Sequence, residues 1–242
     1  MEALTLLLKN GADLHGKGDD GRTPLHLAAH AGKVEALTLL MERGADLHGK
    51  INGGWTPLHL AAHTGDVEAL TLLLEHGADL HGKDDAGWTP LHLATQTADV
   101  EAMTLLLERG ADLHGKDNGG RTLLQVAAHS GVVGALMLLL EHGADLHGKD
   151  NDGRTPLHVA AHSGDVEALT LLLEHGADLH GKDNDGRTPL HLAAHAGEVE
   201  AFTLLLDRGA DLHGKDYGGG TPLDDAKLHR FENLAKLLQR TS

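Results

Sequence analysis

A tetrad of residues, Thr-Pro-Leu-His, recurs along the chain at a fixed interval of 33 residues. Intact copies begin at Thr23, Thr56, Thr89, Thr155 and Thr188. Altered copies, beginning at Thr122 and Thr221, keep the same register. A second signal, Gly-Ala-Asp-Leu-His, repeats with the same step, and no insertion or deletion breaks the phase. A period of this length predicts a stack of small units, each of which contacts only its neighbours.

A single unit, residues 178–210, carries the signals of two short helices. Thr188 is a good N-cap, and Pro189 suits the first position of a helix. Gly197 predicts the end of that helix, and a second apolar helix is expected over 199–207. Each unit is therefore predicted to run turn, helix, turn, helix.

This pattern resembles the ankyrin repeat, in which Thr-Pro-Leu-His is followed by Leu-Ala-Ala and later by Gly-Ala-Asp-Leu. The resemblance covers nearly the whole chain. It implies an all-α ankyrin-repeat solenoid, built of L-shaped helix-turn-helix units with β-turn or loop fingers and stacked with a slight curve. It also implies a role in protein–protein recognition.

The register divides the chain into repeats of one ankyrin-repeat domain, residues 1–242. We expect a partial repeat at 1–12, a capping repeat at 211–242, and six full repeats at 13–45, 46–78, 79–111, 112–144, 145–177 and 178–210. The second helix of the capping repeat is expected near Glu232–Arg240, where polar residues suit an exposed outer face.

The first residues match only the second helix of a repeat, so Leu4, Leu6, Leu7 and Leu8 are expected to be poorly covered. Three interpretations remain open: a piece of a longer protein, a short but intact cap, or a mostly monomeric chain that self-associates at this end.

The formal charge of −16, from 20 basic and 36 acidic residues, argues against general binding to nucleic acid or anionic lipid. A basic or neutral protein partner is easier to reconcile with it. No apolar run approaches the ~18 residues that a membrane span needs, so we expect no membrane association. The absence of cysteine suits a reducing interior, and we expect an intracellular, cytoplasmic protein.

Two tryptophans break the symmetry of the repeats. The residue before the Thr-Pro pair is arginine in most units, but it is Trp55 in the second and Trp88 in the third. By resemblance this position lies on an exposed turn at the concave edge, with equivalent residues about 10 Å apart. Two exposed indoles at that spacing predict an apolar anchor for a partner. The alternative is that each indole packs on its own helix pair and adds only local packing.

Other departures lie beside the tryptophans. Ile51 stands where later units have aspartate, and Gln96-Thr97 replaces the more common His-Ala or His-Ser. Leu123 and Gln125 replace framework residues and are interpreted as drift at structural positions. The predicted partner-binding residues are Trp55, Trp88, Gln96, Thr97 and Arg121, with His63 and Arg154 at the margins.

The 21 histidines suggest metal binding, because pairs such as His26 and His30 share a helix face. By family resemblance, however, the tetrad histidine is committed to hydrogen bonds between repeats. Rows stepped by about 10 Å also cannot place ligands within ~2.0–2.2 Å of one zinc ion. We therefore predict no metal site, and likewise no cofactor and no catalytic residues, since no nucleophile motif or phosphate loop is present.

Two alternatives to partner recognition remain. One is a designed or consensus-like structural array without a dedicated partner, although departures such as Thr95, Ala98 and Gly134 favour natural duplication with drift. The other is a His-rich array that responds to metal or to pH, because histidine titrates near neutrality.

Overall fold

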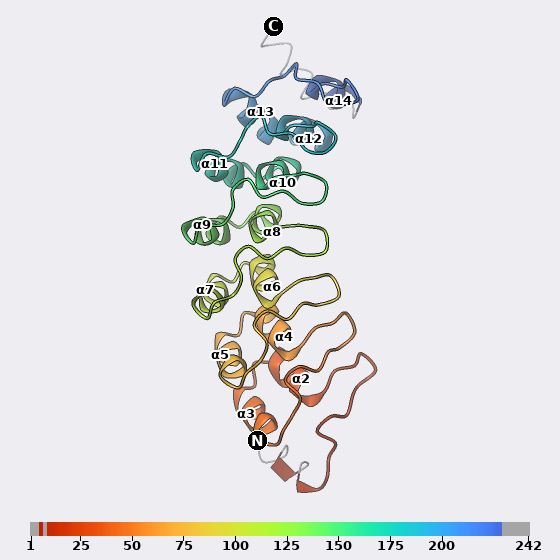
Figure 1. The fold of residues 1–242 in the computed structure, drawn as a ribbon, viewed down its shortest axis with the longest axis vertical. Coiled ribbons are helices and arrows are strands. Elements are labelled where there is room, and N and C mark those ends of the chain that lie inside the picture. Colours follow the sequence, from red (N-terminus) through yellow and green to blue (C-terminus); the bar gives the residue numbers. More distant parts are fainter. Residues whose placement is uncertain (1–4, 7–8, 229–242) are drawn as a thin grey trace. The chain divides into compact units, whose positions relative to one another are not determined.

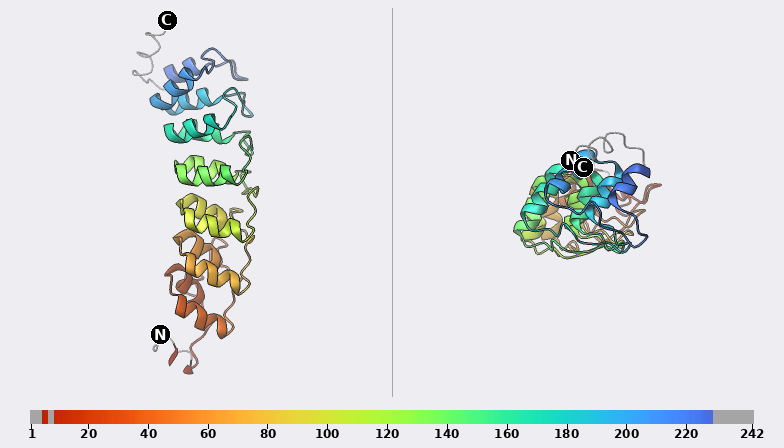
Figure 2. Two further views of the ribbon diagram at one scale, coloured as in Figure 1. Left: turned by 90° about the vertical axis from the view of Figure 1, so that its left-hand side faces the viewer. Right: turned by 90° about the horizontal axis from the view of Figure 1, so that it is seen from above.

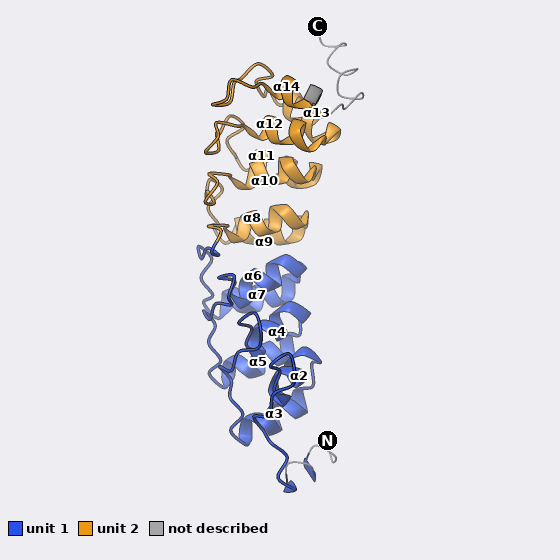
Figure 3. Ribbon diagram, turned by 90° about the vertical axis from the view of Figure 1, so that its right-hand side faces the viewer, with its two compact units in different colours: residues 1–118 blue, residues 119–242 orange. Residues whose placement is uncertain are grey.

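The structure is a computed structural model that describes residues 5–6 and 9–228. The chain forms two compact units, residues 1–118 and 119–242, which Figure 3 distinguishes and which are described one at a time. The helix predicted near Glu232–Arg240 and the leucines at 4, 7 and 8 lie outside the described residues. Leu6, which is described, is 60% exposed.

In the first unit, each repeat contributes two antiparallel helices. The first helices are α2 (Pro24–His30), α4 (Pro57–Thr64) and α6 (Pro90–Thr97). The second helices are α3 (Val34–Glu42), α5 (Val67–Glu75) and α7 (Val100–Glu108). First helices pack on first helices and second helices on second helices, which gives two parallel columns (Figure 1).

The second unit repeats this arrangement. Its first helices are α8 (Leu123–Ser130), α10 (Pro156–Ser163), α12 (Pro189–Ala196) and α14 (Pro222–Leu228). Its second helices are α9 (Val133–Glu141), α11 (Val166–Glu174) and α13 (Val199–Asp207). The predicted all-α helix-turn-helix architecture is confirmed, and the bounds of α12 and α13 follow the expected caps.

Local sequence explains where the helices begin. Thr56 closes a capping box with His59, three residues into α4, and proline occupies the first turn. Asp66 caps α5 by accepting a hydrogen bond from the backbone N–H of Ala69 at 2.8 Å. The capping box recurs in α2, α6, α8, α10 and α12, and aspartate also caps α7 and α11, so these helix boundaries keep the period of the sequence.

Leucine and alanine form the core, because aromatic residues are only 2% of the chain. Leu58, Leu70 and Leu73 are fully buried between the two helix columns of the first unit. Burying one such side chain contributes roughly 1.5–3 kcal/mol. The alanines Ala61 and Ala62 let neighbouring first helices approach closely.

The loops between repeats project to one side of the helices in each unit (Figure 2). Their turns are linked by single backbone hydrogen bonds, such as Asp85 N–H to Gly53 O at 3.0 Å. Lysine side chains add a second link, as when Lys50 Nζ donates to the carbonyl of Lys83 at 2.7 Å. These bonds hold each turn against the turn of the next repeat. The exposed side chains of the turns are therefore carried on an ordered backbone.

Ala98 is the only described residue other than glycine with a positive φ, at 59°. It ends α6 in the left-handed conformation, where α4 ends at Gly65. Because a side chain destabilises this conformation, Ala98→Gly is expected to raise the free energy of unfolding by about 1 kcal/mol in urea denaturation. The reverse change, Gly65→Ala, is expected to lower it, because the new Cβ would also meet the Asp99 carboxylate. Equal stability of Ala98→Gly and the parent would contradict this account.

Candidate functional site

Both tryptophans lie on the turns that precede a first helix, as predicted, but they are half-buried rather than exposed. The indole Nε1–H of Trp55 donates to Asp84 Oδ2 of the next repeat at 2.9 Å. That of Trp88 donates to Asp117 Oδ2 at 3.0 Å. The indole rings are half-buried because the N–H of each ring binds a carboxylate of the neighbouring turn. The expectation of fully exposed rings is therefore corrected.

The rings also contact histidines of their own first helices. The Trp55 ring meets His63 edge-on, with 5.2 Å between ring centroids. The Trp88 ring lies tilted on His92, at 6.0 Å. The structure thus brings together Trp55 and His63, two of the predicted site residues. Part of each indole surface stabilises the repeat, while the remainder faces solvent.

Ile51 cannot make the turn hydrogen bonds that an aspartate makes at the equivalent position of later repeats. At the equivalent position, Asp84 Oδ1 accepts from the backbone N–H groups of Ala86 at 2.9 Å and Trp88 at 2.7 Å. An isoleucine side chain cannot accept these bonds. Ile51 is itself half-buried in the same turn as Trp55. The turn of the second repeat therefore presents an apolar pair where the repeats at 112–144, 145–177 and 178–210 present an aspartate and an arginine.

Gln96 and Thr97 form the last turn of α6, and both are exposed. The Thr97 hydroxyl donates back to the carbonyl of Leu93 at 3.1 Å, which leaves its methyl group on the surface. Gln96 occupies in the third repeat the position of His63 in the second. Five of the predicted residues, Trp55, His63, Trp88, Gln96 and Thr97, thus lie in the first unit on its turns and first helices.

The remaining predicted residues, Arg121 and Arg154, lie in the second unit. Arg121 is exposed, and Arg154 is half-buried. Arg154 Nη1 is 3.9 Å from Asp152 Oδ2, and its backbone N–H donates to Asp150 Oδ1 at 2.8 Å. Both arginines occupy the turn position that tryptophan takes in the first unit.

In several of the described repeats, a buried histidine connects the first helix to the loop of the next repeat. His59 Nδ1 accepts from the N–H and hydroxyl of Thr56, at 3.2 and 2.7 Å. Its Nε2–H donates to the carbonyl of Trp88 at 3.1 Å. Because Nδ1 accepts a backbone N–H, the proton lies on Nε2 and the ring is neutral. The core histidine thus fixes the backbone of a candidate binding residue.

His158 makes the equivalent bond, to Arg187 O at 3.1 Å, whereas His26 bonds Gly49 O, which lies earlier in the next repeat, at 2.9 Å. Burial lowers the pKa of His26, His59 and His158 below 6.5, and the bonds to backbone carbonyls act in the opposite direction without cancelling it. These histidines belong to the framework, which agrees with the role that the family resemblance implied.

Gln125 replaces the histidine in the repeat at 112–144 and makes equivalent hydrogen bonds. Its Oε1 accepts from Thr122 N–H at 2.8 Å, and its Nε2 donates to Arg154 O at 2.6 Å. Leu123, in place of proline, is fully buried at the start of α8. Both positions are structural.

Histidines and carboxylates do not assemble into a metal site in the part of the chain that the structure describes: no group of three or more is placed to hold one ion. Within the same residues, no helix has both the length and the apolar character needed to cross a membrane.

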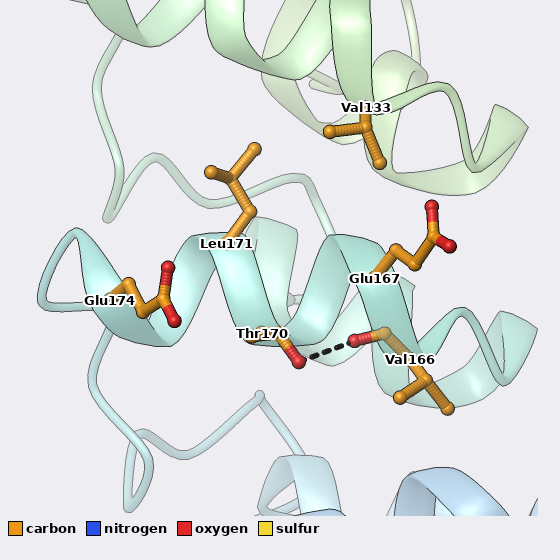
Figure 4. A pocket seen from close by; sticks show the side chains of 6 residues that line it. All are labelled: Val133, Val166, Glu167, Thr170, Leu171 and Glu174. Carbon is orange, nitrogen blue, oxygen red and sulfur yellow. Dashed lines mark hydrogen bonds between the residues drawn. The ribbon is translucent and has the colours of Figure 1, made fainter.

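A surface on α9 and α11 escaped the sequence-based prediction. Val133, Val166 and Leu171 line an open pocket of about 320 Å³ there. The six residues that line it (Figure 4), Val133, Val166, Glu167, Thr170, Leu171 and Glu174, recur at the same positions in other repeats, so no departure in the sequence marked it.

The uninterrupted register, the capped helix pairs and the linked turns define a helical repeat protein. Residues 1–84, 48–117 and 112–183 match a family model described as ankyrin repeats (3 copies), and residues 172–226 match one described as ankyrin repeats (many copies). The chain belongs to the ankyrin-repeat family, as the sequence predicted. The comparison with curated proteins gave no match.

Proposed function

We propose that this chain binds a partner protein through the turns and first helices of its repeats, the concave face in the ankyrin family. The proposed site in the first unit comprises Trp55, His63, Trp88, Gln96 and Thr97. Arg121 and Arg154, in the second unit, are proposed as further partner contacts. Ankyrin repeats are generally protein-interaction modules, which supports a role in recognition rather than catalysis.

The observation that carries the proposal is the replacement of arginine by tryptophan on two consecutive turns. Each indole is held by a carboxylate of the next turn and by a histidine ring, yet keeps part of its surface in solvent. Aromatic side chains held in one conformation lose little entropy on binding, and tryptophan is enriched at interface hot spots. Ile51 extends the apolar surface at the cost of turn hydrogen bonds.

The charge of the chain indicates the kind of partner. A formal charge of −16 favours a basic or neutral protein surface over an acidic one. An apolar or aromatic group of the partner would pack on the indoles, and its basic groups would meet the surrounding carboxylates. The cysteine-free composition suits the cytoplasm as the place of this interaction.

The proposal is tested by affinity capture from a lysate of the source cell, comparing the parent with Trp55→Arg, Trp88→Arg. Arginine is chosen because other repeats carry it at this position, where Arg187 Nε binds Asp183 Oδ2 at 3.0 Å. We expect a protein that the parent retains and the variant loses, with affinity lowered at least about thirtyfold.

The matched control for charge is Glu35→Gln, Glu42→Gln, which changes net charge equally on the exposed surface of α3. This control is expected to keep the partner. Retention of every captured protein by the tryptophan variant would exclude the site. Capture of nothing by the parent would favour a structural array without a dedicated partner, and capture that depends on added zinc or on acidic pH would favour the His-array alternative.

A further inference from the structure

Two of the turns between repeats carry the dipeptide Asn-Gly at the same position, namely Asn52-Gly53 and Asn118-Gly119. All four residues are exposed. Such a pair can modify itself, because the backbone nitrogen of the glycine can attack the side-chain carbonyl of the asparagine. Glycine has no Cβ to hinder this approach. Local structure decides whether a pair reacts, since hydrogen bonds can hold both the attacking nitrogen and the carboxamide in place.

The attacking nitrogen of the first pair is not held. In the third repeat, Asp84 Oδ1 accepts from the N–H of Ala86, two residues further on, at 2.9 Å. The equivalent aspartates of the repeats at 145–177 and 178–210 make the same bond, at 3.0 and 2.9 Å. Ile51 stands at this position in the second repeat, and its side chain cannot accept. Within the described residues, Gly53 N–H consequently has no hydrogen-bond acceptor.

The backbone of this turn also differs from that of its counterparts. Gly54 N–H donates to Ile51 O at 2.9 Å, so residues 51–54 form a β-turn with Asn52 and Gly53 at its centre. Gly53 has a φ of 89°, as the third residue of a type II turn requires, whereas the equivalent Ala86 does not have a positive φ. The peptide between Asn52 and Gly53 is therefore turned over, and two consecutive glycines leave this turn free to change conformation.

The carboxamide of the first pair is not held either. Asn118 Nδ2 donates to Asp85 O of the preceding turn at 3.0 Å. Asn52 makes no such bond to the part of the preceding turn that the structure describes. Its backbone N–H is also bound more loosely, at 3.3 Å from Asp20 O, where Asn118 N–H is 3.0 Å from Ala86 O. Asn52 therefore meets both conditions for reaction, and Asn118 does not.

We propose that the peptide bond between Asn52 and Gly53 is a site of spontaneous self-modification. Gly53 N loses its proton to hydroxide and forms a bond to Asn52 Cγ, an attack favoured because both groups belong to neighbouring residues. The bond from Cγ to Nδ2 breaks, and the leaving nitrogen takes a proton from water and departs as ammonia. Water then adds to either carbonyl of the resulting succinimide and opens the ring. The product at position 52 is aspartate or isoaspartate, with one new negative charge.

The modification changes the turn that carries Trp55. An isoaspartyl residue carries the main chain through its side chain, which lengthens the turn by one methylene group. Gly53 O accepts from Asp85 N–H at 3.0 Å, and the Trp55 indole binds Asp84 in that same turn. A longer turn displaces both contacts. We therefore expect the modified chain to lose its partner, a consequence that depends on the function proposed above for Trp55.

The test is incubation of the folded chain at mildly alkaline pH, followed by trypsin digestion and mass spectrometry that distinguishes aspartate from isoaspartate. Cleavage after lysine and arginine places Asn52 in the peptide 51–83 and Asn118 in the peptide 117–121, so each pair is followed separately. A third pair, Asn10-Gly11, falls in the peptide 10–17 and adjoins residues outside the described part of the chain. We expect conversion at Asn52 to be at least about tenfold faster than at Asn118, because hydrogen bonds must break before Asn118 reacts.

The controls separate local structure from intrinsic reactivity. In the urea-unfolded chain, Asn52 and Asn118 are expected to convert at similar rates. Ile51→Asp and Ile51→Asn each supply an acceptor for Gly53 N–H, one charged and one neutral, and both are expected to slow conversion at Asn52 about tenfold. Ile51→Val, which supplies none, is expected to convert as fast as the parent. Equal rates at the two pairs in the folded chain, or an Ile51→Asn variant as fast as the parent, would overturn the proposal.

Affinity capture with the incubated chain reports on the proposed function separately. The peptide map establishes whether Asn52 has converted, and the capture establishes whether the altered turn still binds. Conversion at Asn52 with full retention of the partner would leave the modification site standing and would contradict the role proposed for the Trp55 turn in binding.

Discussion

Replacing His59 by alanine is expected to lower the free energy of unfolding by about 3–5 kcal/mol, measured by urea denaturation followed by circular dichroism. The ring is fully buried, so the change leaves a cavity. It also leaves the Thr56 N–H and the Trp88 carbonyl without their partner. Since each unpaired buried group adds its own desolvation penalty, the loss exceeds that of an ordinary core truncation.

The matched control is His59→Gln, which copies the residue found at Gln125. Gln125 accepts from Thr122 N–H and donates to Arg154 O, so a glutamine at 59 is expected to preserve both bonds. We expect this variant to lie within about 1 kcal/mol of the parent. Equal destabilisation by alanine and glutamine would show that the hydrogen bonds do not hold the turn, and that lost packing alone explains the loss of stability.

Stability is also expected to fall as the pH falls below about 6.5. Burial lowers the pKa of His26, His59 and His158 in the folded state, whereas the unfolded chain titrates near the ordinary value of 6.5. The unfolded state therefore binds protons first as the pH drops. The stabilising contribution of the neutral histidines is complete above the pKa of the unfolded chain. It is lost progressively as the pH falls toward the lower pKa of the folded state. Melting temperatures measured between neutral and mildly acidic pH should decrease monotonically.

The control for this pH effect is the triple variant His26→Gln, His59→Gln, His158→Gln. Glutamine does not titrate, so the melting temperature is expected to depend less on pH while remaining close to that of the parent at neutral pH. A remaining decrease is expected from His162, whose pKa is lowered by burial and by the nearby charge of Arg154. An unchanged dependence of melting temperature on pH in the triple variant would show that groups other than these three histidines cause it.

The repeat period and the caps made the helical fold predictable from sequence. The period fixed the position of each Thr-Pro pair, and such pairs begin helices for local reasons of backbone geometry and capping. The ends of α4 and α12 at Gly65 and Gly197 follow from glycine's tolerance of positive φ. Ala98 shows that the stack can impose this conformation on another residue.

The details of the site were less predictable, because they depend on contacts across repeats. The sequence located Trp55 and Trp88 on turns, but their burial depends on Asp84 and Asp117 of the following repeats. The structural role of Gln125 depends on its hydrogen bond to the Arg154 carbonyl, 29 residues away, which the sequence alone does not place. The pocket between α9 and α11 depends on the packing of two neighbouring second helices, which the sequence of a single repeat does not specify.

Hydrogen–deuterium exchange of the chain, with and without its captured partner, tests the central claim most directly. We expect slower exchange at 50–56 and 83–89, the turns that carry the tryptophans, and in the last turns of α4 and α6. We expect this protection to disappear in Trp55→Arg, Trp88→Arg at the same partner concentration. Protection confined to the second helices, or equal protection of the parent and the variant, would contradict recognition through the turns and first helices.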